Sequence, residues 1–195
     1  MAEILSHCLL CGSEDLKQDK YATATLNLAE EHGVTQCCRC GLRFLNPRPT
    51  RQEYDQLNGQ QTGPLTALYP VQEGFYGKED ARRLVEYRNK LNILLKHGAK
   101  GRILEIGSCT GVFLNEARQR GFDVEGIEPS EENRLIAREK FGLNLHGGTV
   151  EQQNFPDNSF DVVFSSHVFE HLLDPLMVAK RVARWLKPGG LHMME

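Results

Sequence analysis

The chain has 195 residues, of which 40% are hydrophobic and 25% are charged, and this composition is typical of a globular protein with one domain and a small accessory module. Its formal net charge of -3 means that the chain has no excess of positive charge for general nucleic-acid binding, so a nucleic-acid partner is disfavoured. No apolar run is long enough to span a bilayer and the N-terminus lacks the layout of a signal peptide, so we expect a cytoplasmic protein without a membrane partner.

Two cysteine pairs stand near the start of the chain. Cys8 and Cys11 form one Cys-x-x-Cys knuckle, Cys37 and Cys40 form another, and a glycine follows each. Two thiolates on such a turn can hold one edge of a tetrahedral ion, and a second pair completes a set of four sulfur ligands. The pattern predicts a structural zinc ion in a zinc-ribbon-like module over residues 1–50, because four thiolates leave no open position for catalysis.

Other uses of these cysteines remain open. Cys38 offers a second register for the later knuckle, and His7 or His32 could replace a cysteine ligand. A redox dithiol is a different function for the same residues.

The segment after the module has little periodicity. A strand fragment over residues 42–45 runs into two prolines, and residues 51–77 predict a linker or a mobile lid. Phe75 and Tyr76 could pack over a ligand or anchor the segment to the core. From residue 78 to residue 97 apolar side chains recur at helical spacing, which predicts a helix that opens a second domain over residues 78–195.

Residues 102–114 combine a short apolar strand, a tight turn from Gly107 to Gly111 and the start of a helix. Such a turn lets backbone N–H groups approach a polar ligand closely, with a helix N-terminus directed at it. The dinucleotide fingerprint requires glycine at the first, third and sixth positions, which are Gly107, Cys109 and Val112 here, so only the first fits. The turn therefore predicts a nucleoside ligand other than a dinucleotide.

Strands and helices then alternate to the end of the chain. Strands are expected over residues 122–127, 143–146 and 160–165, and helices over residues 111–121, 130–142 and 174–186. This order predicts an α/β fold with a doubly wound parallel sheet that binds ligands at the carboxyl ends of its strands. Glu128 directly follows the second strand, about 20 residues after the turn, where a carboxylate can accept both ribose hydroxyls. A solvated surface acid is the alternative.

Over most of residues 79–191 the chain resembles class I S-adenosylmethionine (SAM) methyltransferases. The first family motif is represented by Glu105, Gly107, Cys109 and Gly111, and residues 148–151, 155–161, 168–172 and 186–190 resemble later motifs. The resemblance implies a Rossmann-like fold and SAM as the cofactor. It implies cofactor contacts from the two glycines and nine further residues: Glu105, Gly107, Ser108, Cys109, Gly111, Glu128, Pro129, Thr149, Val150, Glu151 and Ser165.

Two positions depart from the family pattern. Cys109 stands where glycine is usual, and we expect it to keep a negative φ and to serve as packing, not as a reactive thiol. Thr149 replaces the usual aspartate, so contact with the adenine is expected from the backbone and Val150, with Glu151 as a further candidate.

The segment after the strand over residues 160–165 bears on the methyl acceptor. It reads Ser-Ser-His-Val from Ser165, whereas family members that methylate exocyclic amines of bases or glutamine carry Asp or Asn, two prolines and an aromatic residue. The resemblance therefore favours a small hydroxylated or sugar-like acceptor, as in sugar, polysaccharide and natural-product methyltransferases. His167 is the first candidate for a catalytic base and His171 the second, and a pocket-lining or solvent-exposed histidine is the alternative reading of His167.

The family sheet has seven strands, and this chain ends at residues 191–195, where the fifth would form. We therefore expect a C-terminally truncated domain whose exposed fifth strand could support oligomerisation. Two other functions remain open: a noncatalytic SAM-binding or interaction module, and a ribosomal RNA methyltransferase that uses the zinc ribbon to hold RNA.

Overall fold

The computed structural model describes residues 2–26, 33–53 and 78–195, which fall into a smaller N-terminal unit and a larger C-terminal unit. The expected linker or lid lies outside the described residues from residue 54 onward, and so do Phe75, Tyr76 and His32.

The N-terminal unit is a small antiparallel sheet beside one short helix. Its elements are β1 (Leu16–Gln18), α1 (Lys20–Thr25), β2 (Val34–Cys37) and β3 (Arg43–Leu45), and the strand order is β1-β2-β3. The strand expected over residues 42–45 is thus confirmed as β3. The second cysteine knuckle forms the connection between β2 and β3, in which Gly41 takes a left-handed φ of +80°.

The larger unit alternates helices and strands, as its sequence pattern predicts. Its elements are α4 (Lys78–Lys96), β4 (Arg102–Ile106), α5 (Val112–Arg118), β5 (Asp123–Ile127), α6 (Glu131–Phe141), η1 (Val150–Gln152), β6 (Phe160–Ser165), η2 (Phe169–His171), α7 (Pro175–Trp185) and β7 (Leu186–Met194). Local signals set several of these bounds. Ser130 caps α6 by accepting a hydrogen bond from the Asn133 N–H, and Gly142 ends the helix with a left-handed φ of +63°.

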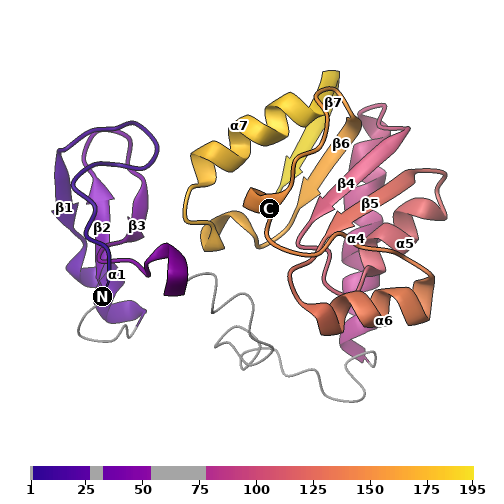
Figure 1. The fold of residues 1–195 in the computed structure, drawn as a ribbon, viewed down its shortest axis with the longest axis horizontal. Coiled ribbons are helices and arrows are strands. Elements are labelled where there is room, and N and C mark those ends of the chain that lie inside the picture. The colour runs from indigo at the N-terminus through magenta and orange to yellow at the C-terminus, as the bar shows by residue number, and fades with distance from the viewer. Residues whose placement is uncertain (1, 27–32, 54–77) are drawn as a thin grey trace. The chain divides into compact units, whose positions relative to one another are not determined.

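The four strands of this unit form a parallel sheet in the order β5-β4-β6-β7, and they lie side by side in Figure 1. The chain runs from β4 outward to β5 and then returns across β4 to β6. The order therefore reverses between β4 and β6, which is the point where open α/β sheets bind ligands. The predicted α/β fold class is confirmed.

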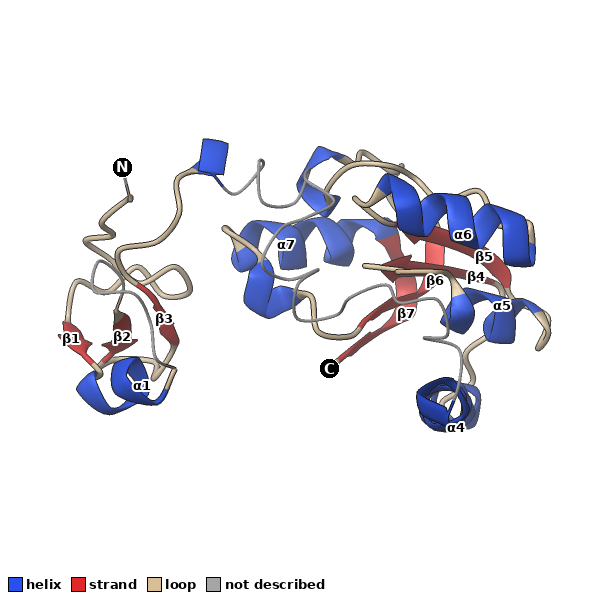
Figure 2. Ribbon diagram, turned by 90° about the horizontal axis from the view of Figure 1, so that it is seen from below, coloured by secondary structure: helices blue, strands red, loops and turns tan. Residues whose placement is uncertain are grey.

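Helices cover both faces of this sheet (Figure 2). One face packs on buried residues of α4, α5 and α6, including Leu91, Phe113 and Ala137. The other face packs on α7 through Val178, Val182 and Trp185. None of the described helices has the length and apolar character that crossing a membrane requires.

The prediction of a strand over residues 143–146 is wrong. Only His146 pairs there, in an isolated parallel bridge with Ile127. The segment is short because Gly142 ends the preceding helix and Gly147 and Gly148 turn the chain away, while Leu143 is buried in the core.

The end of the last helix also differs slightly from expectation. α7 ends at Trp185, and Leu186 already pairs with Phe160 as the first residue of β7. The pairing of β6 with β7 then shifts in register, because Phe160 pairs with Leu186 whereas Val162 pairs with Leu191. The residues of β7 between these two pairs, which include Pro188–Gly190, form an irregularity in the strand.

Candidate functional site

The four predicted zinc ligands gather at one point of the N-terminal unit. The Sγ atoms of Cys8, Cys11, Cys37 and Cys40 all lie within 4.8 Å of one another. The Sγ separations of Cys8 from Cys40 and of Cys11 from Cys37 are both 3.6 Å. These separations are too long for disulfides, and they are close to the edge of roughly 3.8 Å that a zinc tetrahedron with Zn–S bonds of about 2.3 Å requires.

Backbone geometry adapts both knuckles to this arrangement. The N–H of Gly12 donates to the carbonyl of Cys8 at 3.0 Å, and the N–H of Gly41 donates to the carbonyl of Cys37 at 2.9 Å. Hydrogen bonding from the backbone N–H of Cys40 lowers the pKa of the Cys37 thiol to about 6. The pKa of the Cys40 thiol is raised: the Leu42 N–H opposes the rise, and burial and the other three cysteines cause it. Cys38 is exposed and does not belong to the cluster, and His7 is also exposed.

In the larger unit, the turn after β4 is built around two glycines with left-handed backbones. Gly107 has a φ of +74° and Gly111 a φ of +79°. A methyl group on Gly107 would lie 2.6 Å from Cγ2 of Val168, and one on Gly111 would lie 2.8 Å from Cδ1 of Leu143. Both glycines are therefore required by backbone conformation and by space.

Ser108 has a structural role within this turn. The residue is only 3% exposed, and its hydroxyl donates to the carbonyl of Glu105 at 3.0 Å. The N–H groups of Gly107 and Ser108 both donate to the carbonyl of Ile127 at 2.9 Å. The turn is thereby fixed to the end of β5.

Cys109 does not keep the negative φ that we expected, because its φ is +48°. The left-handed conformation directs its N–H to Oε2 of Glu128, at 2.8 Å. Burial and the negative charge of Glu128 raise the pKa of the Cys109 thiol to about 11, although part of the residue remains exposed.

Glu128 is buried at the carboxyl end of β5, with 7% of the residue exposed, so the solvated surface acid is excluded. Its Oε1 accepts hydrogen bonds from the N–H of Ser130 at 2.9 Å and from the side-chain amide of Asn133 at 3.3 Å. Burial raises the pKa of this carboxyl, and the hydrogen-bond donors around it oppose that rise. The carbonyl of the adjacent Pro129 accepts a hydrogen bond from Arg134.

Glu105, near the end of β4, is a second buried carboxyl close to Glu128. Burial raises its pKa well above the ordinary value, and the negative charge of Glu128 adds to the rise, while Lys90 of α4 opposes it. Oε2 of Glu105 is buried and has no hydrogen-bond partner within the described part of the chain. Two neighbouring carboxyls with an unpartnered oxygen form a site suited to a ligand that carries positive charge or hydrogen-bond donors.

The residues expected near an adenine lie on the turn that follows His146. Thr149, Val150 and Glu151 are all buried, and Thr149 is the N-cap of the short helix η1. Val150 packs in the core against β4 and β5 residues, so its backbone is more available to a ligand than its side chain. The Thr149 N–H donates to Oε1 of Gln152 at 2.9 Å.

The third strand end at the site is that of β6, where Ser165 pairs in register with Ile106. Ser165 is 1% exposed, and its hydroxyl lies 3.4 Å from Nε2 of His192. His167 follows with a left-handed φ of +54°, and its side chain is 77% exposed. Nδ1 of His167 lies 3.4 Å from Oε1 of Glu170, and His171 is exposed on η2.

Sequence reasoning missed four polar or aromatic residues around these carboxyls: Tyr87, Lys90, Asn133 and Arg134. Burial raises the pKa of Tyr87 above its usual range, and the negative charge of Glu105 adds to the rise. Asn133 and Arg134 could have been suspected because the first turn of a helix that follows an acidic strand end faces that end. No sequence signal relates Lys90 to Glu105.

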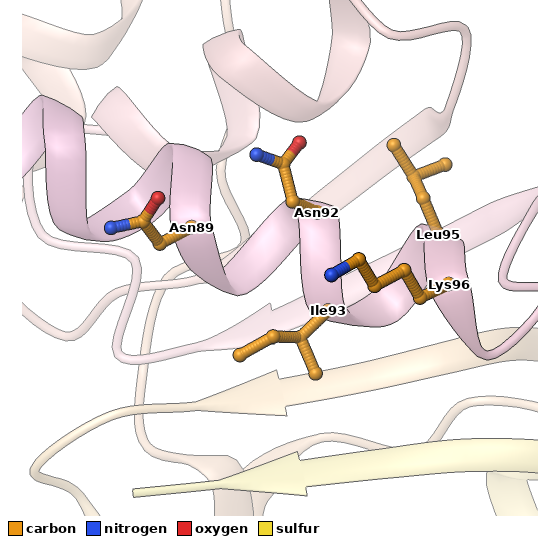
Figure 3. Close-up of a pocket in the computed structure, with 5 residues that line it drawn as sticks. All are labelled: Asn89, Asn92, Ile93, Leu95 and Lys96. Atoms are coloured by element: carbon orange, nitrogen blue, oxygen red, sulfur yellow. The ribbon is translucent and has the colours of Figure 1, made fainter.

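A hollow of about 630 Å³ lies elsewhere, on α4, and is lined by Asn89, Asn92, Ile93, Leu95 and Lys96 (Figure 3). It contains none of the predicted site residues. The strand ends that carry Glu105, Glu128 and Ser165 are therefore the better candidate site, since they combine two buried carboxyls with the unpartnered Oε2 of Glu105.

Comparison with known proteins finds relatives that are named as methyltransferases. A relative from Bradyrhizobium diazoefficiens, named ubiquinone biosynthesis O-methyltransferase, is 29% identical over 137 residues, which are 68% of this chain and 52% of the relative. A relative of the same name from Azorhizobium caulinodans is 32% identical over 155 residues, which are 73% of this chain and 59% of the relative. The chain thus spans little more than half the length of these relatives.

Solved structures and a family model complete the comparison. The PH0226 protein of Pyrococcus horikoshii matches with a TM-score of 0.58 and 25% identity, over 68% of this chain and 61% of that protein. The family model described as a methyltransferase domain matches residues 76–195. From its fold, the arrangement of its strand ends and this match, the chain belongs to the methyltransferase-domain family.

Proposed function

We propose that the protein transfers a methyl group from SAM to a small hydroxylated acceptor. The observation that carries the proposal is that the buried carboxyls of Glu128 and Glu105 lie at the ends of the paired strands β5 and β4, and that Oε2 of Glu105 has no hydrogen-bond partner among the described residues. The relatives named ubiquinone biosynthesis O-methyltransferases support oxygen as the acceptor atom.

The chemistry of the donor set fits SAM, which would supply an activated methyl group on a sulfonium sulfur. The carboxylate of Glu128 would accept hydrogen bonds from ribose hydroxyls. The unpartnered Oε2 of Glu105 offers an acceptor for a cationic or N–H group of the same ligand. Backbone groups of the segment Thr149–Glu151 would contact the adenine, and Ser165 would form part of the wall at the end of β6.

The protein residues have two tasks in such a transfer. They must hold the acceptor oxygen in line with the methyl carbon, and they must take up the hydroxyl proton. We assign the second task to His167, because it lies directly after β6 with an exposed ring and Glu170 close to Nδ1. A neutral imidazole nitrogen can accept the proton as the oxygen forms its bond to carbon.

We further propose a structural zinc ion in the N-terminal unit, bound by Cys8, Cys11, Cys37 and Cys40. The support is the near-tetrahedral spacing of their sulfur atoms. The described residues of this unit form three short strands and include few buried apolar side chains, so a metal would supply much of its stability.

The decisive experiment incubates the protein with SAM and a panel of phenols, catechols and sugars, and follows formation of S-adenosylhomocysteine and methylated product by mass spectrometry. Product that carries a methyl group on oxygen supports the proposal. Tight binding of SAM without transfer to any acceptor would instead favour a noncatalytic module.

A further inference from the structure

We infer that Asn133 and Arg134, on the first turn of α6, are positioning residues that hold Glu128 in the orientation and charge state needed to bind a ribose. This inference rests on the proposed function, because it takes Glu128 as the ribose acceptor. Neither residue is expected to touch the nucleoside. Both act through the carboxyl group and its backbone.

Arg134 fixes the backbone that carries the acid. Its Nη1 donates to the carbonyl of Glu128 at 2.8 Å and to the carbonyl of Pro129 at 2.6 Å. A single guanidinium nitrogen thus closes the turn between β5 and α6, and it limits the directions in which the Glu128 side chain can leave the backbone.

The same guanidinium contacts the segment proposed to bind the adenine. A methyl group on Gly147 would lie 3.2 Å from Cζ of Arg134 and 3.4 Å from its Nε, so the backbone of Gly147 lies directly against the planar group. Gly147 and Gly148 immediately precede Thr149, Val150 and Glu151. Arg134 therefore links the proposed ribose acid to the proposed adenine segment.

Asn133 acts on the carboxylate itself. Its side-chain amide donates to Oε1 of Glu128 at 3.3 Å, while its own N–H is used by the Ser130 cap. The N–H of Ser130 donates to the same carboxylate oxygen, so two hydrogen bonds from one helix start set the position of Oε1.

The charges around Glu128 come from three elements. Glu105 on β4 is negative when ionised, and the Cys109 thiol lies on the turn after β4. Arg134 on α6 is the cation that acts on Glu128, and it opposes the effect of burial together with the N–H and amide donors. Loss of Arg134 or of the Asn133 amide therefore favours the protonated acid, which can no longer accept two ribose hydroxyls.

The test measures binding of S-adenosylhomocysteine by the full chain with calorimetry between pH 5 and pH 9. Four variants are compared with the wild type: R134M, R134K, N133A and R138M. Arg138 is exposed on the same helix and donates to Oδ1 of Asn144, so it is the matched control.

We expect R134M and N133A to bind about three- to thirtyfold more weakly at neutral pH, the size typical of coupling between groups in contact. As the pH is lowered, the affinity of both variants should begin to fall at a higher pH than the affinity of the wild type does. R134K keeps the positive charge, so the pH at which acid weakens its binding should lie closer to that of the wild type than in R134M. R138M should match the wild type. The inference would be overturned if R134M and N133A both kept the wild-type affinity and its pH dependence. It would also be overturned if R138M weakened binding as much as they do.

A second measurement does not need the ligand. Carbon-13 NMR titration of the Glu128 carboxyl in ligand-free protein should give a higher pKa in N133A and R134M than in the wild type, and an unchanged pKa overturns the inference. If the wild type fails to bind S-adenosylhomocysteine while this titration shifts, the proposed function fails and the positioning of Glu128 stands. If R134M does not fold, N133A alone provides the same readouts of affinity and of the Glu128 pKa.

Discussion

The N–H of Cys109 donates a hydrogen bond of 2.8 Å to Oε2 of Glu128, and this bond joins the turn after β4 to the turn after β5. The bond depends on the left-handed backbone of Cys109, whose φ is +48°. A non-glycine residue in this conformation carries strain of roughly 1–2 kcal/mol. The hydrogen bond to a charged acceptor offsets that strain, so the conformation of the turn and the position of the acid depend on each other.

The substitution E128Q should weaken binding of S-adenosylhomocysteine by about 10- to 100-fold, which corresponds to the roughly 1.5–3 kcal/mol typical of hydrogen bonds to charged groups. The amide keeps the size of the side chain but loses its charge and one acceptor. Because burial raises the pKa of Glu128, wild-type affinity should also fall as pH decreases through that pKa. Calorimetry across the acid range measures both effects.

The control for this variant is E132Q, since Glu132 lies on the first turn of α6 and is exposed. Its affinity and pH profile should match those of the wild type. Undiminished binding by E128Q would remove Glu128 from the site.

The substitution E105Q should stabilise the ligand-free protein at neutral pH and weaken binding of SAM. The pKa of Glu105 is raised in the folded state, so the stability that its neutral form provides is full at acid pH and is lost as pH rises through the folded-state pKa. A neutral amide avoids this loss. A gain of about 1 kcal/mol would raise Tm by about 2–4 °C.

Thermal unfolding at several pH values tests whether E105Q raises or lowers the stability of the protein. The difference in Tm between E105Q and the wild type should shrink as the solution becomes acidic, because the wild-type carboxyl is then protonated in both the folded and unfolded states. A variant less stable than the wild type at neutral pH, together with unchanged SAM affinity, would contradict this account of the buried acid.

Much of the larger unit could be predicted because its signals are local. The strand over Phe160–Ser165 is an apolar run bounded by turn residues, and its observed bounds are those expected. The start of α6 was equally clear, since Ser130 supplies a cap and Glu131 and Glu132 favour the positive end of the helix dipole. The glycines at 107 and 111 marked the turn for a related reason, because they permit a backbone that other residues rarely adopt.

The errors and omissions involve contacts between segments distant in sequence. Residues 143–146 have the composition of a strand, but a ladder needs a partner along its full length and only His146 finds one. The positive φ of Cys109 is compensated by Glu128, which lies 19 residues later. Likewise the sequence gives no indication that the charge of Lys90, on α4, lowers the pKa of Glu105.

The substitution C37S should abolish stoichiometric zinc and unfold the N-terminal unit, because four sulfur ligands complete the proposed tetrahedron and Cys37 is buried within it. Zinc content by mass spectrometry and backbone NMR signals of residues in β1 to β3 provide the measurement. Addition of a chelator to the wild type should have the same effect.

C38S is the matched control, since Cys38 is adjacent in sequence but exposed and outside the cluster. It should retain one zinc ion per chain and the wild-type spectrum. Zinc retained by C37S and lost by C38S would show that the second knuckle uses the other register.

The substitution H167Q should lower kcat for methyl transfer to a hydroxyl by about 10²- to 10⁴-fold, the range typical of general base catalysis. Affinity for S-adenosylhomocysteine should stay unchanged, because the His167 side chain is 77% exposed and lies beyond the buried carboxyls. H97Q is the control, since His97 is exposed at the end of α4. A large loss of kcat in H171Q with normal turnover by H167Q would assign the proton transfer to His171 instead. Normal turnover by both variants would mean that the acceptor hydroxyl loses its proton to solvent or to a group on the acceptor itself.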